Sequence, residues 1–135
     1  MKAIADTGFL VAFWNRRDTH HAWAVKIAEA VTEPLLTCDA VLAETAFHLG
    51  SARLALAFVE EGLVRPVFVV ADHLQRLKEL AARYADRSPD LADLCLIRLS
   101  ELHPRHPVIT TDYNDFRVYR RGRREAIPII HPPQR

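Results

Sequence analysis

Residues 2–14 read KAIADTGFLVAFW and place a carboxylate between a short apolar run and an apolar helical segment. Residues 2–6 are typical of a buried strand. Thr7 can cap a helix over the following segment, whose apolar side chains recur at helical spacing. The stretch therefore predicts a strand that delivers Asp6 at its carboxyl end and turns directly into a helix.

The same alternation of strand and helix continues along the chain. Further strands are predicted at residues 34–38, 65–71, 108–111 and 127–131. Helices are predicted at residues 18–33, 39–50, 51–62, 72–86 and from residue 88 onward. This order indicates an α/β fold in three layers, with a mainly parallel central sheet and helices on both faces, as a single domain over residues 1–135.

Composition and charge narrow the class of protein further. Half of the residues are hydrophobic and 26% are charged, which suits a packed core and excludes a disordered or fibrous chain. The 18 basic and 17 acidic residues nearly cancel, so any electrostatic specialisation must be local. No apolar stretch approaches the roughly 18–20 residues that span a bilayer, and Asp6 interrupts the first apolar run. We expect a soluble cytoplasmic protein with no membrane contact.

The two cysteines do not suggest a metal centre. Cys38 and Cys95 are far apart in the sequence and form no CxxC pair. Neither a zinc site nor a disulfide framework is indicated.

Four carboxylates fall where a catalytic site would form in such a fold. Asp6 and Asp112 both follow predicted strands, and ligands of open α/β sheets bind beyond the carboxyl ends of the strands. Glu44 lies in the middle of a helix among small and apolar neighbours, and Asp93 lies near a helix start. Clustered carboxylates repel one another unless a cation is present. We therefore expect one or two Mg²⁺ or Mn²⁺ ions and phosphoryl chemistry.

Several of the acids also have ordinary explanations. Asp18, Asp39 and Asp72 are expected to be helix caps, and Asp90 a cap or a first-turn charge. Glu44 taken alone could be a solvated helix residue.

The motifs IADTGFLVAF, VLAETAFHL, DLADLCLIRLSE and VITTDYNDF, in this order, resemble those of PIN-domain ribonucleases, and most closely the VapC-like toxin branch. The resemblance covers essentially the whole chain. It implies that Asp6, Glu44, Asp93 and Asp112 form an acidic quartet that binds Mg²⁺ or Mn²⁺ for endonucleolytic cleavage of RNA. Asp115 matches an additional acid of many members.

Two threonines match small hydroxyl positions of the family. Thr7 follows the first acid and Thr110 precedes the last by two residues, and both are implied to help hold the metal site or the substrate. Their ordinary roles would be a helix cap for Thr7 and a strand residue for Thr110.

A basic cluster follows the last acidic motif. It consists of Arg117, Arg120, Arg121, Arg123 and Arg124 and is a candidate to bind phosphates, because arginine forks match phosphate oxygens. The substrate-binding residues expected from it are Arg117, Arg120 and Arg121. The alternative is a solvated basic loop.

The resemblance also implies partners. VapC-like proteins pair with a small antitoxin that occupies the active-site groove, and they form homodimers. Some apolar residues could line such a groove, namely Phe9, Phe13, Trp14, Phe47 and Leu54. We expect most of them to be buried in the core instead.

Two other functions remain open from the sequence, and a third is disfavoured. The chain could be a stand-alone PIN-type RNA-processing nuclease or a non-catalytic interaction module of the same fold. An aspartyl-phosphate enzyme or receiver domain is disfavoured, because Gly8 stands where a phosphatase would need a second aspartate and the receiver's acidic pair and lysine are missing. The preference for RNA over DNA rests on the resemblance alone.

Overall fold

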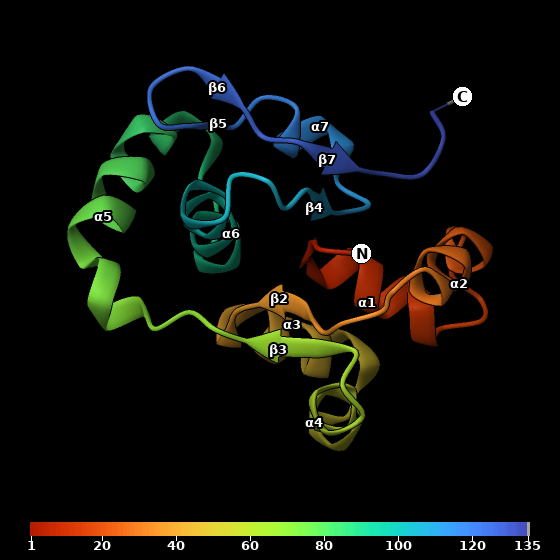
Figure 1. The fold of residues 1–135 in the computed structure, drawn as a ribbon. Coiled ribbons are helices and arrows are strands. Elements are labelled where there is room, and N and C mark those ends of the chain that lie inside the picture. Colours follow the sequence, from red (N-terminus) through yellow and green to blue (C-terminus); the bar gives the residue numbers. More distant parts are fainter. Residues whose placement is uncertain (135) are drawn as a thin grey trace.

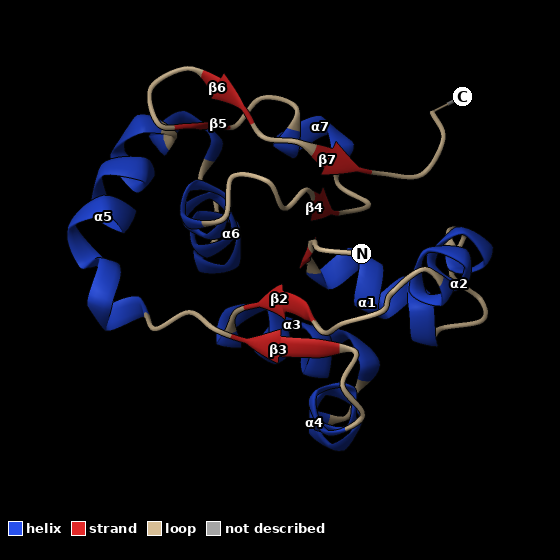
Figure 2. Ribbon diagram, in the orientation of Figure 1, coloured by secondary structure: helices blue, strands red, loops and turns tan. Residues whose placement is uncertain are grey.

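The computed structural model describes residues 1–134 (Figure 1). At its centre is a parallel sheet with the strand order β3-β2-β1-β4-β7. The strands are β1 (Ile4–Ala5), β2 (Leu35–Thr37), β3 (Val64–Pro66), β4 (Val108–Ile109) and β7 (Ile129–Ile130). Helices flank this sheet (Figure 2), which confirms the predicted α/β fold class.

Helices make up most of the remaining chain. They are α1 (Thr7–Trp14), α2 (His21–Glu29), α3 (Asp39–Leu49), α4 (Ala52–Glu60), α5 (Leu74–Arg83), α6 (Leu91–Leu102) and α7 (Tyr113–Phe116). Two 3₁₀ turns, η1 (Val70–His73) and η2 (Ala85–Arg87), bracket α5. A short antiparallel hairpin of β5 (Arg120–Arg121) and β6 (Glu125–Ala126) stands apart from the main sheet. No helix within residues 1–134 is long and apolar enough to cross a membrane.

The centre of the sheet sets the geometry of the site. Ile4 of β1 pairs with Leu36 of β2 on one side and with Val108 of β4 on the other. All three residues are buried, and the long helix α6 packs against this region with most of its side chains buried. Because β1 and β4 are parallel neighbours, the residues that follow them emerge at the same edge of the sheet.

The third strand is shorter than the predicted range of residues 65–71. Pro66 pairs with Thr37, which is the last residue of β2. Helix α3 begins two residues later, so the ladder has no partner strand beyond this point. The chain instead turns into η1, and Asp72 lies within that 3₁₀ turn rather than capping a long helix.

Helix starts also differ from the predictions. The side chain of Asp6, not Thr7, caps α1 by accepting a hydrogen bond from the backbone N–H of Thr7 at 2.7 Å. Asp18 accepts a hydrogen bond from the backbone of His20 and forms a turn that precedes α2. Cys38 occupies the N-cap position of α3, and Asp39 lies in its first turn.

Two aromatic residues lie outside the core. Trp14, expected to be a core residue, is 50% exposed at the end of α1, where its ring meets that of Phe58 edge to face. Phe47 on α3 is 82% exposed, whereas Phe9 is fully buried. Phe13 and Leu54 are partly buried.

Candidate active site

The carboxyl edge of the sheet gathers the four predicted acids in one cleft. Asp6 directly follows β1, and Asp112 lies three residues beyond the end of β4. Glu44 reaches the cleft from α3 and Asp93 from the first turn of α6. The cleft has a volume of about 370 Å³ and also contains Asp90 and Asp115. Six carboxylates from four parts of the chain therefore share one cavity.

Both predicted threonines hold acids of this cleft. The hydroxyl of Thr110 donates to Oδ2 of Asp6 at 2.6 Å, and the hydroxyl of Thr7 donates to Oε1 of Glu44 at 3.0 Å. Thr110 Oγ1 also accepts a hydrogen bond from the backbone N–H of Asp112 at 2.9 Å. The two hydroxyls thus fix the positions of three acids that come from different elements.

The side chain of Asp93 is held by a tyrosine whose role the sequence does not indicate. The Tyr119 hydroxyl donates to Oδ2 of Asp93 at 3.0 Å, and the Tyr119 ring is buried between Phe116 and Tyr84. Asp90 caps α6 by accepting a hydrogen bond from the backbone N–H of Asp93, as one of its predicted roles required. No motif marks Tyr119, because its partner lies 26 residues earlier in the chain.

Burial and crowding raise the pKa values of the acids. Burial, with smaller contributions from Asp112 and Glu44, raises the pKa of Asp6 to about 6 against the hydrogen bonds from Thr110 and Thr7. Burial and then the charge of Asp90 raise the pKa of Asp93 to about 7. Burial also raises the pKa values of Glu44 and Asp112. The cleft thus strongly disfavours the simultaneous ionisation of all four acids.

Within residues 1–134, one arginine lines this cleft. Arg87, from η2, donates through Nη2 to Oδ1 of Asp115 at 3.0 Å and lines the cavity. Sequence reasoning missed Arg87, because it lies outside the basic cluster that follows Asp112. It brings a half-exposed guanidinium to the rim of an acidic cavity.

Two of the predicted arginines are engaged elsewhere in the fold. Arg121 is buried, where its guanidinium donates to the carbonyl and hydroxyl of Ser100 and forms an ion pair with Glu125. Arg120 donates through Nη1 to the carbonyl oxygens of residues 117–119 and so closes the turn before the hairpin. The structure does not bring either side chain to the acidic cleft, because both stabilise the hairpin instead.

Arg117 differs from its two neighbours. Its side chain is exposed and stands over the ring of Tyr113, with 5.9 Å between the guanidinium carbon and the ring centroid. It remains free to contact a substrate.

The cleft has the donor chemistry that a hard divalent cation requires. Within residues 1–134 no three carboxylate, imidazole or thiol groups are already close enough together to enclose an ion. Carboxylate oxygens are nevertheless the ligands that Mg²⁺ and Mn²⁺ prefer, and a cation among them would reverse the repulsion that raises their pKa values. The chemistry of the quartet therefore fits such an ion.

Comparison with known proteins identifies the family. The sequence model of the PIN domain matches residues 3–122, and the chain belongs to the PIN domain family. The resemblance found in the motifs is thereby confirmed at the level of the family.

A solved structure shares the fold. The crystal structure of VapC20 from Mycobacterium tuberculosis, described as a toxin that cleaves the sarcin-ricin loop, superposes with a TM-score of 0.67 at 22% identity. The match covers 78% of this chain and 86% of VapC20. No curated protein sequence matches the chain.

Proposed function

We propose that this protein is a metal-dependent endoribonuclease that hydrolyses phosphodiester bonds of RNA in the acidic cleft. The observation that carries the proposal is the convergence of Asp6, Glu44, Asp93 and Asp112 from four separate elements on one cavity. A fold gains nothing in stability from crowding carboxylates whose pKa values rise as a result. Such a cluster is typical of a site that binds a cation and does chemistry with it.

The residues of the cleft have distinct roles in this proposal. Asp6, Glu44, Asp93 and Asp112 would hold one or two Mg²⁺ or Mn²⁺ ions, with Asp115 as an additional ligand. A bound ion supplies a Lewis acid for the phosphate and lowers the pKa of water. Thr7 and Thr110 orient Glu44 and Asp6 through the hydrogen bonds described above, and Tyr119 orients Asp93.

In this proposal, arginine side chains near these acids bind the substrate. Arg87 lies at the rim of the cavity, where its guanidinium can exchange Asp115 for a substrate phosphate. Arg117 is exposed close to the same helix α7 and can contact the RNA backbone. Phosphate contacts of this kind supply affinity and carry no base specificity.

We further propose that the protein is the cytoplasmic toxin of a type II toxin-antitoxin pair and forms a homodimer. Membership of the PIN family and the fold shared with VapC20 support this assignment. Exposed aromatic side chains, above all Phe47 and Trp14, provide surfaces for a small antitoxin and a second copy of the chain. Affinity capture from the source cells should recover a small protein in equimolar amount. Recovery of the nuclease alone would favour a stand-alone RNA-processing enzyme.

Cleavage by the purified protein tests the enzymatic proposal. Single-stranded and structured RNA, and DNA of the same sequence, are incubated with Mg²⁺, with Mn²⁺ or with chelator. We expect RNA cleavage that requires the cation and is lost in Asp6→Asn and Asp93→Asn. Asp72→Asn serves as the control, because Asp72 is an exposed acid of η1 outside the cleft. A folded, antitoxin-free protein that cuts no RNA with either ion would contradict the proposal and favour a binding module.

A further inference from the structure

A second polar hollow lies between α5, α6 and the β5–β6 hairpin, outside the acidic cleft. It has a volume of about 530 Å³. Five arginines and two glutamates line it, an excess of three positive charges in a chain whose net charge is +1. The lining arginines are Arg76, Arg83, Arg98, Arg121 and Arg123. We call this region the arginine hollow.

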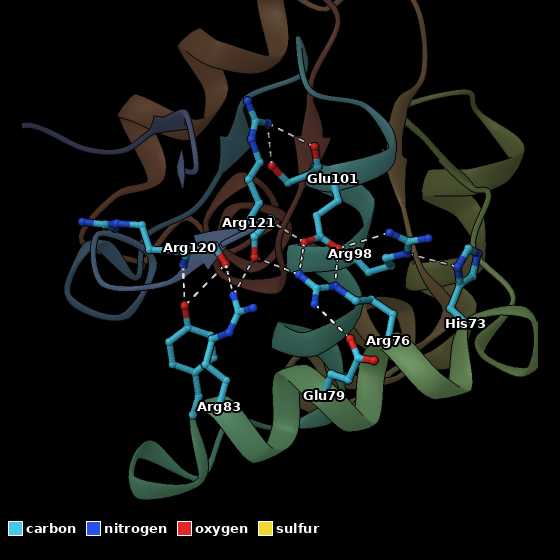
Figure 3. Close-up of polar contacts among 11 residues, drawn as sticks. His73, Arg76, Glu79, Arg83, Arg98, Glu101, Arg120 and Arg121 are labelled. Atoms are coloured by element: carbon cyan, nitrogen blue, oxygen red, sulfur yellow. Dashed lines mark hydrogen bonds and ion pairs between the residues drawn. The ribbon is translucent and has the colours of Figure 1, made fainter. Parts of the chain in front are cut away.

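Glu101 and Glu125 hold the inner part of the arginine hollow, and Figure 3 shows the contacts of Glu101. Glu101 on α6 accepts hydrogen bonds from Arg76 on α5 and from Arg98, and also from the backbone N–H of Gly122. Glu125 pairs with the buried Arg121. The glutamates are therefore occupied by inner arginines, and α5, α6 and the hairpin are tied together around one rigid frame.

The outer arginines are not neutralised in this way. Arg83 is exposed and donates only through Nη1, to the carbonyl oxygens of Gly122 at 2.9 Å and Arg120 at 3.4 Å. Arg123 is exposed and forms no ion pair with any residue from 1 to 134. Two guanidinium groups with unused donors thus face solvent beside a preorganised frame, which is the arrangement that binds phosphate.

The arginine hollow and the acidic cleft share one segment of the chain. Tyr119 lines the cleft, whereas Arg121 and Arg123 line the hollow. Both Tyr119 and Arg121 are buried, but Arg83 of the hollow and Arg87 of the cleft are exposed. These two arginines are four residues apart, so their Cα atoms lie at most roughly 14 Å from each other. A polyanionic strand that leaves the cleft past Arg87 would therefore reach Arg83 within a few nucleotides.

We propose that the arginine hollow binds the phosphodiester backbone of RNA next to the segment held in the acidic cleft, with Arg83 and Arg123 as the contacting side chains. The identity of the polyanion as RNA rests on the proposed function. An extended RNA chain suits the hollow better than a small anion, because Arg83 and Arg123, which have no carboxylate partner within residues 1–134, lie on different elements. They also border a second site that is proposed to bind phosphate. Contacts of this kind set affinity and register and are not selective for bases.

Binding in the absence of cleavage tests the proposal. A labelled RNA of 16 nucleotides is titrated in chelator at several salt concentrations, with the intact protein and with Arg83→Gln/Arg123→Gln. We expect about a tenfold loss of affinity at low salt, and a slope of log K against log salt that is smaller by about 1.4, since each single-strand phosphate contact contributes about 0.7.

Arg53→Gln/Arg65→Gln is the matched control. It removes the same charge from exposed positions on α4 and β3. We expect it to leave the slope unchanged. An equal loss in both double variants, or no loss in either, would overturn the proposal. Displacement of the RNA by millimolar inorganic phosphate from the intact protein but not from Arg83→Gln/Arg123→Gln would also overturn it, because the hollow would then be a small-anion site.

The test separates this inference from the proposed nuclease function. If RNA binds through the arginine hollow in a salt-dependent way but is not cleaved with either cation, the nuclease function is refuted. RNA binding by the hollow is then still supported. Cleavage that requires the quartet, combined with unchanged binding by Arg83→Gln/Arg123→Gln, would refute the hollow alone.

Discussion

Thr110 donates a 2.6 Å hydrogen bond to Oδ2 of Asp6, although the two residues are 104 positions apart in the chain. The same hydroxyl oxygen accepts a hydrogen bond from the backbone N–H of Asp112. One side chain therefore sets the relative position of the first and last acids of the cleft. It also supplies a donor to Oδ2 of this buried carboxylate, whose Oδ1 accepts from the backbone of Thr7.

Thr110→Val should destabilise the protein by about 2 kcal/mol, because it leaves a buried, ionised carboxylate without one hydrogen bond at nearly unchanged volume. Urea unfolding at pH 8 in chelator measures the change. Thr110→Ser keeps the hydroxyl and should lose less than about 1 kcal/mol. Equal losses in the two variants would show that the hydroxyl has no such role.

Tyr119→Phe should lower the rate of RNA cleavage and the affinity for Mn²⁺ by about tenfold, the usual effect of removing a residue that orients a metal ligand. The phenyl ring keeps the packing against Phe116 and Tyr84, so stability should change little. Tyr113→Phe, beside His131 and away from Asp93, is the control. Unchanged cleavage and unchanged Mn²⁺ affinity in Tyr119→Phe would exclude the positioning role.

Stability without metal should fall as the pH rises from 5 to 8. Folding raises the pKa of Asp6 to about 6 and that of Asp93 to about 7, above their ordinary value of 3.8. The folded state therefore binds protons more tightly, and the stability from these groups, complete below about pH 4, is lost as the pH passes through the raised values. Divalent cation should restore stability at pH 8 and have little effect at pH 5.

Asp93→Asn should remove part of this pH dependence. In chelator at pH 8 we expect its melting temperature to exceed that of the intact protein by about 4 °C, roughly 1 kcal/mol for a domain of this size. At pH 5 the two proteins should melt together. Thermal unfolding scans measure these melting temperatures, with Asp72→Asn as the control. A lower melting temperature for Asp93→Asn than for the intact protein at pH 8 would contradict the repulsion assigned to Asp93.

Gly8→Ala should destabilise the protein by about 2 kcal/mol through overpacking. A Cβ at Gly8 would lie 2.0 Å from Oγ1 and 3.2 Å from Cβ of Thr111, across the floor of the cleft. Thr111→Ala removes the closer atom, so the double variant should recover more than half of the loss in a double-mutant cycle. Additive effects would show that the two side chains do not collide.

Local patterns account for what the sequence predicts well. Strand ends and helix starts depend on neighbouring residues, so the sequence predicts Asp6 and Asp112 at strand ends and Asp93 at a helix start. The length of β3 could not be predicted, because it depends on where β2 ends.

The surroundings of the acids depend on distant contacts. Nothing near Arg121 in the sequence indicates that Ser100 buries its guanidinium, and nothing near Tyr119 indicates its hydrogen bond to Asp93. Nearness in the sequence therefore predicts phosphate binding by Arg120 and Arg121, whereas the arginine at the cleft is Arg87 from a separate turn.

Titration with Mn²⁺, followed by the electron paramagnetic resonance signal of the free ion, tests most directly whether the four acids form one cation site. The account predicts saturable binding of one or two ions at pH 8 by the intact protein and by Asp72→Asn. It predicts that Asp6→Asn and Asp93→Asn each lose most of this binding while remaining folded. Binding of equal strength in all four proteins would contradict the assignment of the quartet.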